Sequence, residues 1–170
     1  MVFTGAYDHT IDAKNRLAIP SEVRALMQAA LKGKDKPLQL YVTLGEKVHS
    51  RHCLALYAER DFRKRAAEML RSQNAPEQLL NFERWWFSMA RLVELDGAGR
   101  IRLPENLIEL AGLGGEVILL GVNDHMEIHD RAAWQEQVRQ AINDPTRMVI
   151  ANPRRAIGWG RQGSQDGMQN

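Results

Sequence analysis

Residues 12–20 read Asp12-Ala13-Lys14-Asn15-Arg16-Leu17-Ala18-Ile19-Pro20, and residues 96–104 read Asp96-Gly97-Ala98-Gly99-Arg100-Ile101-Arg102-Leu103-Pro104. Both stretches keep aspartate, arginine and proline in the same places, at a constant offset of 84 residues (96 − 12). Self-similarity at a fixed offset indicates an internal repeat. Two copies are too few for a solenoid, so the pattern predicts a duplicated half-domain.

A second matching block follows in each copy at a smaller offset of 72 residues (126 − 54). Its matched apolar positions are Leu54, Leu56 and Phe62 in the first copy, with Met126, Ile128 and Trp134 in the second. The difference of 12 residues (84 − 72) means that the first copy has the longer middle, which we place around residues 32–36.

Each copy predicts a strand, a tight turn and a second strand. Residues 7–11 and 92–95 are short β-prone runs, and residues 16–20 and 100–104 alternate polar with apolar as strands do. Asn15 and Gly99 share one slot of the turn, which predicts a left-handed backbone there, because glycine and then asparagine tolerate that conformation best. Pro20 and Pro104 end the second strand and can sit in the first turn of a helix.

Further elements follow from spacing and capping. We expect helices over residues 21–30, 105–110 and 59–72, a helix start at residues 74–77, and strand pairs 38–44 with 53–56 and 117–120 with 126–128. Asp130 is the predicted N-cap of a last helix whose buried face carries Trp134 and Val138. The predicted segments are a first half (4–60), a helical connector (61–89), a second half (90–133), a C-terminal helix (134–150) and a flexible tail (151–170).

Composition bounds the class of protein. Of 170 residues, 44% are hydrophobic and 26% charged, so an ordinary core is expected. The net charge of +2 neither demands nor excludes nucleic acid, because a binding face needs only local positive charge. The single cysteine, Cys53, favours a reducing compartment, and neither a signal peptide nor a membrane-length apolar run is present. We expect a cytoplasmic protein.

The aspartate and arginine of each repeat lie four residues apart across the turn. A carboxylate in that position can hold a guanidinium through a forked pair of hydrogen bonds. A held arginine loses less entropy on binding, and its fork matches the O6 and N7 edge of guanine. Arg16 and Arg100 would then read bases, while Lys14 and Arg102 beside them take phosphates. The alternative is an ordinary surface ion pair, worth about 0–1 kcal/mol without any ligand; its retention in both copies favours the functional interpretation.

The two nine-residue stretches resemble the paired Asp-x-x-x-Arg motifs of the MraZ transcriptional regulators, as do Phe3-Thr4-Gly5 and the endings of the copies, Leu56-Tyr57 and Ile128-His129-Asp130 before Trp134. The resemblance covers roughly residues 3–142. One departure is Asn15, where that family usually has glycine; because asparagine tolerates the same backbone, we expect little damage.

The resemblance implies an α+β fold with an AbrB/SpoVT-like swapped-hairpin β-barrel built from the two halves. It also implies rings of several subunits, nucleoid association and binding to G-rich repeats upstream of the division and cell-wall gene cluster, which includes the protein's own gene. No cofactor, membrane or small-molecule substrate is expected. The DNA-binding residues implied by motif and position are Asp12, Lys14, Asn15, Arg16, Asp96, Gly99, Arg100 and Arg102.

Other classes of function fit less well. The paired aspartates do not indicate an aspartic protease, since neither loop has an Asp-Thr/Ser-Gly run and each carboxylate has an arginine to lower its pKa. A metal site is not expected, because Cys53 aligns with His125 and because His125 and His129 lie about 13 Å apart on a strand. Cys53 is interpreted as a small buried residue, and residues 112–115 as a helix stop and turn.

The aromatic run of the connector has two interpretations. Phe82, Trp85, Trp86 and Phe87 cannot all face one core from a single helix, so some meet the core and others can meet a neighbouring subunit. A purely structural oligomer without DNA would keep these aromatics and would have no use for Arg16 and Arg100.

Overall fold

The computed structural model describes residues 1–31, 37–48, 51–70 and 77–143. In chain order the elements are β1 (Ala6–Thr10), β2 (Arg16–Ala18), α1 (Ser21–Ala30), β3 (Gln39–Val48), β4 (Arg51–Ala58), α2 (Glu59–Leu70), α3 (Glu77–Met89), β5 (Arg91–Glu94), β6 (Arg100–Arg102), α4 (Glu105–Ala111), β7 (Glu116–Val122), β8 (His125–Asp130) and α5 (Arg131–Asn143). Residues 1–134 form one compact unit, and a second begins at Gln135 within α5.

Strands of the two repeats alternate in space. Six strands form an antiparallel sheet in the order β1-β7-β8-β4-β3-β5, and β2 pairs with β6 in a separate two-stranded sheet, here called the ribbon. Strand β1 of the first copy pairs with β7 of the second, β3 with β5, and β4 with β8. Neither copy therefore pairs its strands only within itself. The α+β class is confirmed, while closure into a swapped-hairpin barrel stays a prediction.

The main core lies between the large sheet and the ribbon. Alternate residues of the central strands point into it, and Leu17 and Ile101 close it from the ribbon with no exposed surface. Helices α1 and α4 add Val23 and Leu107, the same matched pair of the repeat, while their counterparts Leu26 and Leu110 are both exposed. The equivalence of the copies thus extends from sequence to burial.

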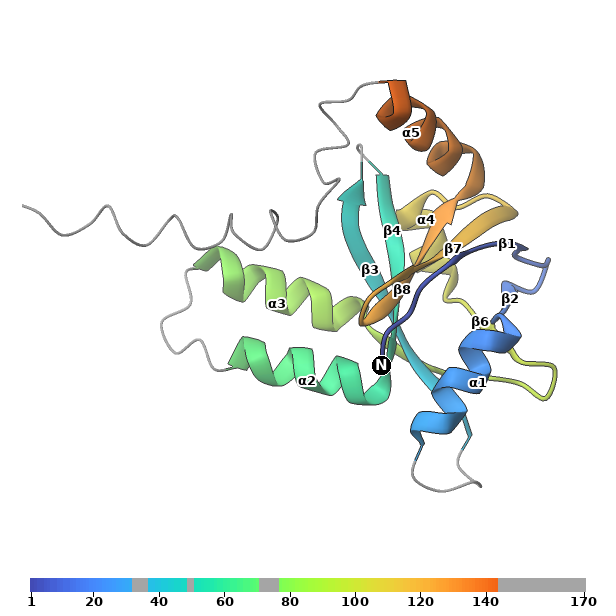
Figure 1. The fold of residues 1–170 in the computed structure, drawn as a ribbon. Helices are drawn as coiled ribbons and strands as arrows, with labels where there is room; N and C mark the ends of the chain where they lie inside the picture. The colour runs from blue at the N-terminus through green and yellow to red at the C-terminus, as the bar shows by residue number, and fades with distance from the viewer. Residues whose placement is uncertain (32–36, 49–50, 71–76, 144–170) are drawn as a thin grey trace, which may run out of the picture. The chain divides into compact units, whose positions relative to one another are not determined.

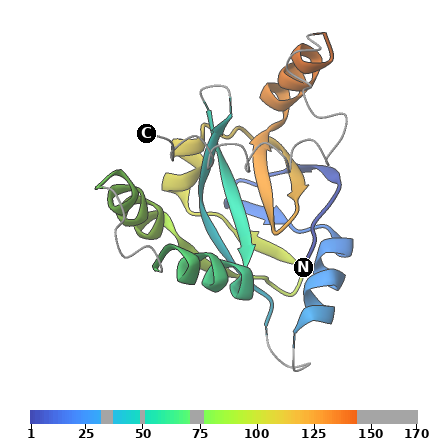
Figure 2. The same cartoon turned by 60° about the vertical axis from the view of Figure 1, so that its left-hand side comes forward.

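The other face of the sheet is covered by α2 and α3, which lie beyond β3 and β4 from the ribbon (Figures 1 and 2). Phe62 of α2 stacks on Trp86 of α3, with ring centroids 4.8 Å apart, and both pack against Tyr57 of β4. Of the connector's aromatics, Trp86 is buried, whereas Phe82, Trp85 and Phe87 are each more than a third exposed. The prediction that they divide between core and surface is confirmed.

Several local predictions can be compared directly. Asp130 Oδ1 accepts a hydrogen bond from the Ala133 amide at 2.9 Å, which confirms the N-cap of α5. Gly112 ends α4 in the left-handed conformation (φ 60°), as predicted for a helix stop. Pro20 and Pro104 occupy the N-cap positions of α1 and α4, one residue before the first turn.

The predicted buried face of the last helix is wrong. Val138 is 38% exposed, and no described residue of α5 is fully buried, so this face does not enter a core. The extra residues 32–36, the start of α3 at 74–76, residues 144–150 and the predicted flexible tail lie outside the described residues. The finer division into segments stays a prediction. Within the described part of the chain, no helix is both long and apolar enough to cross a bilayer.

Candidate nucleic-acid interface

The loop between β1 and β2 holds Arg16 by Asp12. Asp12 Oδ2 accepts hydrogen bonds from Arg16 Nε at 2.8 Å and from Arg16 Nη2 at 2.7 Å. Asp12 Oδ1 accepts the backbone amides of Lys14 and Arg16, each at 2.9 Å. One carboxylate therefore fixes both the turn and the guanidinium, and we call this pair the first clamp.

The loop between β5 and β6 repeats this arrangement atom for atom. Asp96 Oδ2 accepts Arg100 Nε and Nη2, both at 2.9 Å, and Oδ1 accepts the amides of Ala98 and Arg100, also at 2.9 Å. This pair is the second clamp. The two arginine side chains are 33% and 34% exposed, so each guanidinium is held and still accessible.

Both turns need the backbone that the sequence predicted. Asn15 has φ 59° and Gly99 has φ 74°, the left-handed region that asparagine and glycine tolerate best. In each turn the residue in this slot donates its amide to the carbonyl of the clamp aspartate, at 2.8 Å in both cases. The prediction of positive φ at this slot is confirmed.

The ribbon joins the two clamps. Arg16 pairs with Arg102, Leu17 with Ile101, and Ala18 with Arg100. The ends are tied reciprocally: the Leu103 amide donates to the Asn15 carbonyl at 2.8 Å, and the Ile19 amide to the Gly99 carbonyl at 3.0 Å. The backbone of each turn thus closes the strand that follows the other turn.

Strand alternation decides what the ribbon presents. Leu17 and Ile101 point into the core, so Arg16, Arg100 and Arg102 point to the opposite, outer face. Arg102 and Lys14 are exposed, and among the described residues neither makes an ion pair. The outer face therefore combines two clamped arginines with cations that have no acidic partner in the described structure, as expected of an anionic ligand's site.

The clamp aspartates stay ionised. The pKa of Asp12 is lowered to about 2, mainly by the hydrogen bond from the Arg16 amide, with the guanidinium adding to the effect. The pKa of Asp96 is lowered in the same way, first by the Arg100 amide. A carboxylate that is fully ionised at neutral pH is a poor general acid, so this geometry gives a paired-aspartate enzyme no support.

Sequence reasoning missed Arg24 of α1. Its Nε donates to the Ile19 carbonyl at 3.1 Å, and its guanidinium lies over Gly99, where an added Cβ would collide with it. The corresponding residue of the second copy is Ile108, so the second clamp has a neighbouring cation that the first lacks. The unequal pair Arg24 and Ile108 at offset 84 was the only sequence signal for this asymmetry.

A comparison with known families decides the relationship. A family model described as "MraZ protein, putative antitoxin-like" matches residues 2–82 and 86–152. The chain belongs to the MraZ family. The MraZ match covers both clamps, Asp12–Arg16 by its first segment and Asp96–Arg100 by its second.

Individual MraZ relatives have similar lengths. A protein of Mycoplasmoides gallisepticum named transcriptional regulator MraZ is 34% identical over 135 residues, covering 79% of this chain and 86% of the relative. A protein of the same name from Moorella thermoacetica is 36% identical over 142 residues, covering 82% and 88%. A third, from Desulfitobacterium hafniense strain Y51, is 34% identical over 143 residues, covering 82% and 89%. The predicted family resemblance is confirmed.

Proposed function

We propose that this chain is a sequence-specific DNA-binding transcriptional regulator and that the outer face of the ribbon contacts DNA. The observation that carries the proposal is the pair of equivalent clamps that turn Arg16 and Arg100 to one face. The relatives' names, transcriptional regulator MraZ, support the same class.

The residues of the face divide into three roles. Arg16 and Arg100 are the base-reading groups, because a guanidinium held in a fork matches the O6 and N7 of guanine. Lys14 and Arg102 contact phosphates, which position the protein without reading sequence. Asp12 and Asp96 orient the arginines, and Asn15 and Gly99 provide the turn backbone that brings clamp and strand together.

The finer parts of the proposal come from the family resemblance. The fold is an AbrB-like swapped-hairpin barrel, the sites are G-rich repeats upstream of the division and cell-wall genes, and the working form is a homo-oligomeric ring on the nucleoid. The exposed Phe82, Trp85 and Phe87 of α3 give such an assembly an apolar surface to bury. A structural oligomer without DNA binding is the competing function, because it would use those same aromatics.

Fluorescence anisotropy with a short duplex of tandem G-rich repeats tests the proposal at about 50 and 200 mM salt, since phosphate contacts weaken steeply over that range. Wild type should bind, and Arg16→Ala with Arg100→Ala should lose binding. One bidentate guanine contact is worth about 1–3 kcal/mol, so losing two removes specific affinity at either salt concentration. Arg16→Lys with Arg100→Lys should keep binding to an unrelated duplex and lose the preference for G-rich repeats, because lysine keeps charge without the fork.

The matched control is Arg63→Ala. Arg63 also pairs with a carboxylate four residues away, Glu59, but on helix α2. This variant should bind like wild type, and light scattering should find every variant in the wild-type assembly. Wild-type protein that is assembled and yet binds no duplex at about 50 mM salt would leave the structural oligomer as the function.

A further inference from the structure

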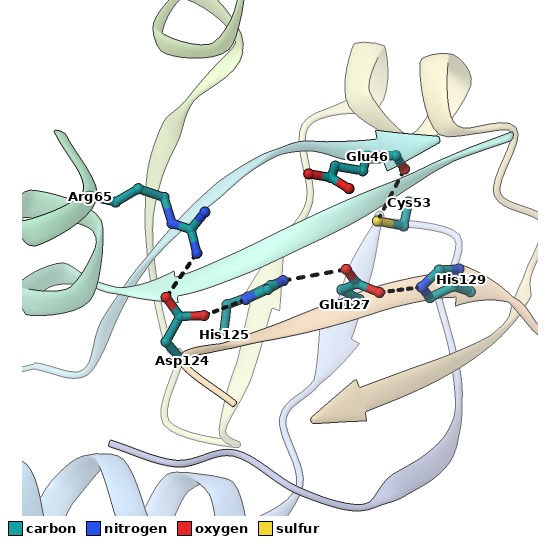
Figure 3. A network of polar contacts seen from close by, with 7 residues as sticks. All are labelled: Glu46, Cys53, Arg65, Asp124, His125, Glu127 and His129. Atoms are coloured by element: carbon teal, nitrogen blue, oxygen red, sulfur yellow. Dashed lines mark hydrogen bonds and ion pairs between the residues drawn. The ribbon is translucent and has the colours of Figure 1, made fainter. Parts of the chain in front are cut away.

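A second group of polar side chains lies on the face of the large sheet turned away from the main core. On β8, Met126 and Ile128 point into the core, so His125, Glu127 and His129 share the opposite face. Glu127 lies between the two histidines: Oε2 is 2.8 Å from His129 Nε2, and Oε1 is 3.3 Å from His125 Nε2 (Figure 3). The carboxylate thus engages both rings.

Strand pairing brings Cys53 to this group. Leu54 of β4 pairs with Ile128 of β8 in antiparallel register, which places Cys53 beside His129. Cys53 Sγ, one Glu127 oxygen and one His129 ring nitrogen all lie within 4.8 Å of one another. Cys53 is fully buried and the His129 side chain is 7% exposed, while Glu127 at 19% leaves a path to solvent.

These three groups are the ligand types that zinc prefers, namely thiolate, imidazole and carboxylate. With bonds of about 2.0–2.3 Å, tetrahedral zinc holds its ligand atoms about 3.5 Å apart, so movements of about 1 Å close the site. The charges also balance, because one thiolate and one carboxylate neutralise a divalent ion in a largely buried place. Three protein ligands leave a fourth position for water.

Outer groups already hold the carboxylate in place. His125 contacts the Glu127 oxygen that faces away from His129, and its Nδ1 is 2.8 Å from Asp124 Oδ1. Arg65 of α2 donates to the other Asp124 oxygen at 2.8 Å (Figure 3). A chain of partners behind a ligand is how proteins orient metal-binding side chains, and removing such a partner costs about 10–100-fold in affinity.

We propose that Cys53, Glu127 and His129 bind a divalent transition-metal ion, zinc above all, which joins β4 of the first repeat to β8 of the second. On binding, the Cys53 thiol gives its proton to solvent, and the ion replaces the hydrogen bond between His129 and Glu127. The site lies across the sheet from the main core and the ribbon, so it is independent of the DNA-binding proposal.

The sequence argument against a metal does not reach this site. It aligned Cys53 with His125, whereas antiparallel pairing sets Cys53 beside His129. The long separation of His125 and His129 on one strand still holds, but only His129 is a ligand here and His125 acts behind Glu127.

Titration of the full chain with Co²⁺, followed by zinc competition, tests the site. Because Cys53 is the chain's only cysteine, a thiolate-to-cobalt absorption band reports on it alone, and zinc should both abolish the band and protect Cys53 from a thiol reagent. Glu127→Gln and His129→Gln should each weaken Co²⁺ binding by more than tenfold, and His125→Gln by about 10–100-fold. His52→Gln, which changes a neighbouring histidine bonded to the Gly45 carbonyl, should bind like wild type.

Two results would overturn the proposal. One is no cobalt band and no zinc protection in folded wild-type protein. The other is a band that persists when Glu127→Gln and His129→Gln are combined, since the thiol would then bind the ion alone. Circular dichroism of each variant establishes that it is folded. Cys53→Ala serves as the thiol-free reference, because a buried free cysteine packs as a small apolar residue.

Discussion

Asp12 links the acid–base behaviour of the chain to the geometry of the first clamp. Its pKa of about 2 lies below the ordinary value of 3.8, so the folded state favours the ionised form. The stabilisation is therefore fully present above the unfolded pKa and is lost as pH falls through the folded pKa, between about pH 4 and pH 2. Asp96 shifts in the same direction.

We expect the side-chain carboxyl carbon of Asp12 to titrate near pH 2 in a carbon-13 NMR experiment. Arg16→Ala should raise that midpoint, but only part of the way to the ordinary value, because the Lys14 and residue-16 amides still donate to Oδ1. Exposed Glu59 offers an internal reference in the same spectra. An Asp12 midpoint near 4 in wild-type protein would mean that the clamp is open in solution.

At the level of elements, the ribbon depends on two side chains. Its strands have three residues each, and the described ladder is too short to be stable without the core beneath it. Leu17 and Ile101 supply that attachment, since both are completely buried. The position of both clamps therefore depends on apolar packing on the reverse side of the same strands.

Leu17→Ala should lower the free energy of unfolding by about 2–5 kcal/mol, the usual cost of truncating a buried leucine. Urea denaturation measures this change. Leu110→Ala, at a leucine that is 50% exposed, is the control and should change stability by no more than about 0.5 kcal/mol. Equal midpoints for the two variants would show that the ribbon is not held by this core.

The sequence predicted the elements and the clamps well, for a local reason. Turn chemistry at Asn15 and Gly99 and the alternation at Arg16–Ile19 act within a few residues, so they can be read from one stretch. Arg24 was missed because its contact with Gly99 joins a helix to a distant loop. The cluster of Cys53 with His129 was missed because parallel alignment of repeats hides which residues antiparallel strands bring together.

At the level of the whole molecule, the repeats are folded only through each other. The described strands β1 and β2 of the first copy pair with β7 and β6 of the second, and β5 pairs with β3. An isolated copy leaves these strands with unpaired edges, which are costly unless another chain pairs with them.

Neither the fragment Met1–Leu70 nor the fragment Glu77–Asn143 should fold as a monomer. Each should be unfolded or self-associated when expressed alone, and co-expression should recover a one-to-one complex with the proton NMR dispersion of the intact chain. Light scattering gives the mass, and the intact chain is the control. A folded, monomeric half would contradict the interleaved arrangement.

The ladder register of the ribbon also limits how much one chain can recognise. Arg16 and Arg100 are diagonal neighbours, with Cα atoms about 7–8 Å apart by strand geometry, which is close to two base-pair steps. If each arginine specifies one guanine, a chain defines two base pairs, and such a pair occurs by chance at about one position in 16. Singling out one address among about 10⁶ competing sites takes about ten specified base pairs. The information needed to find one promoter therefore exceeds what a single chain holds, and several copies acting on one stretch of DNA must supply it together.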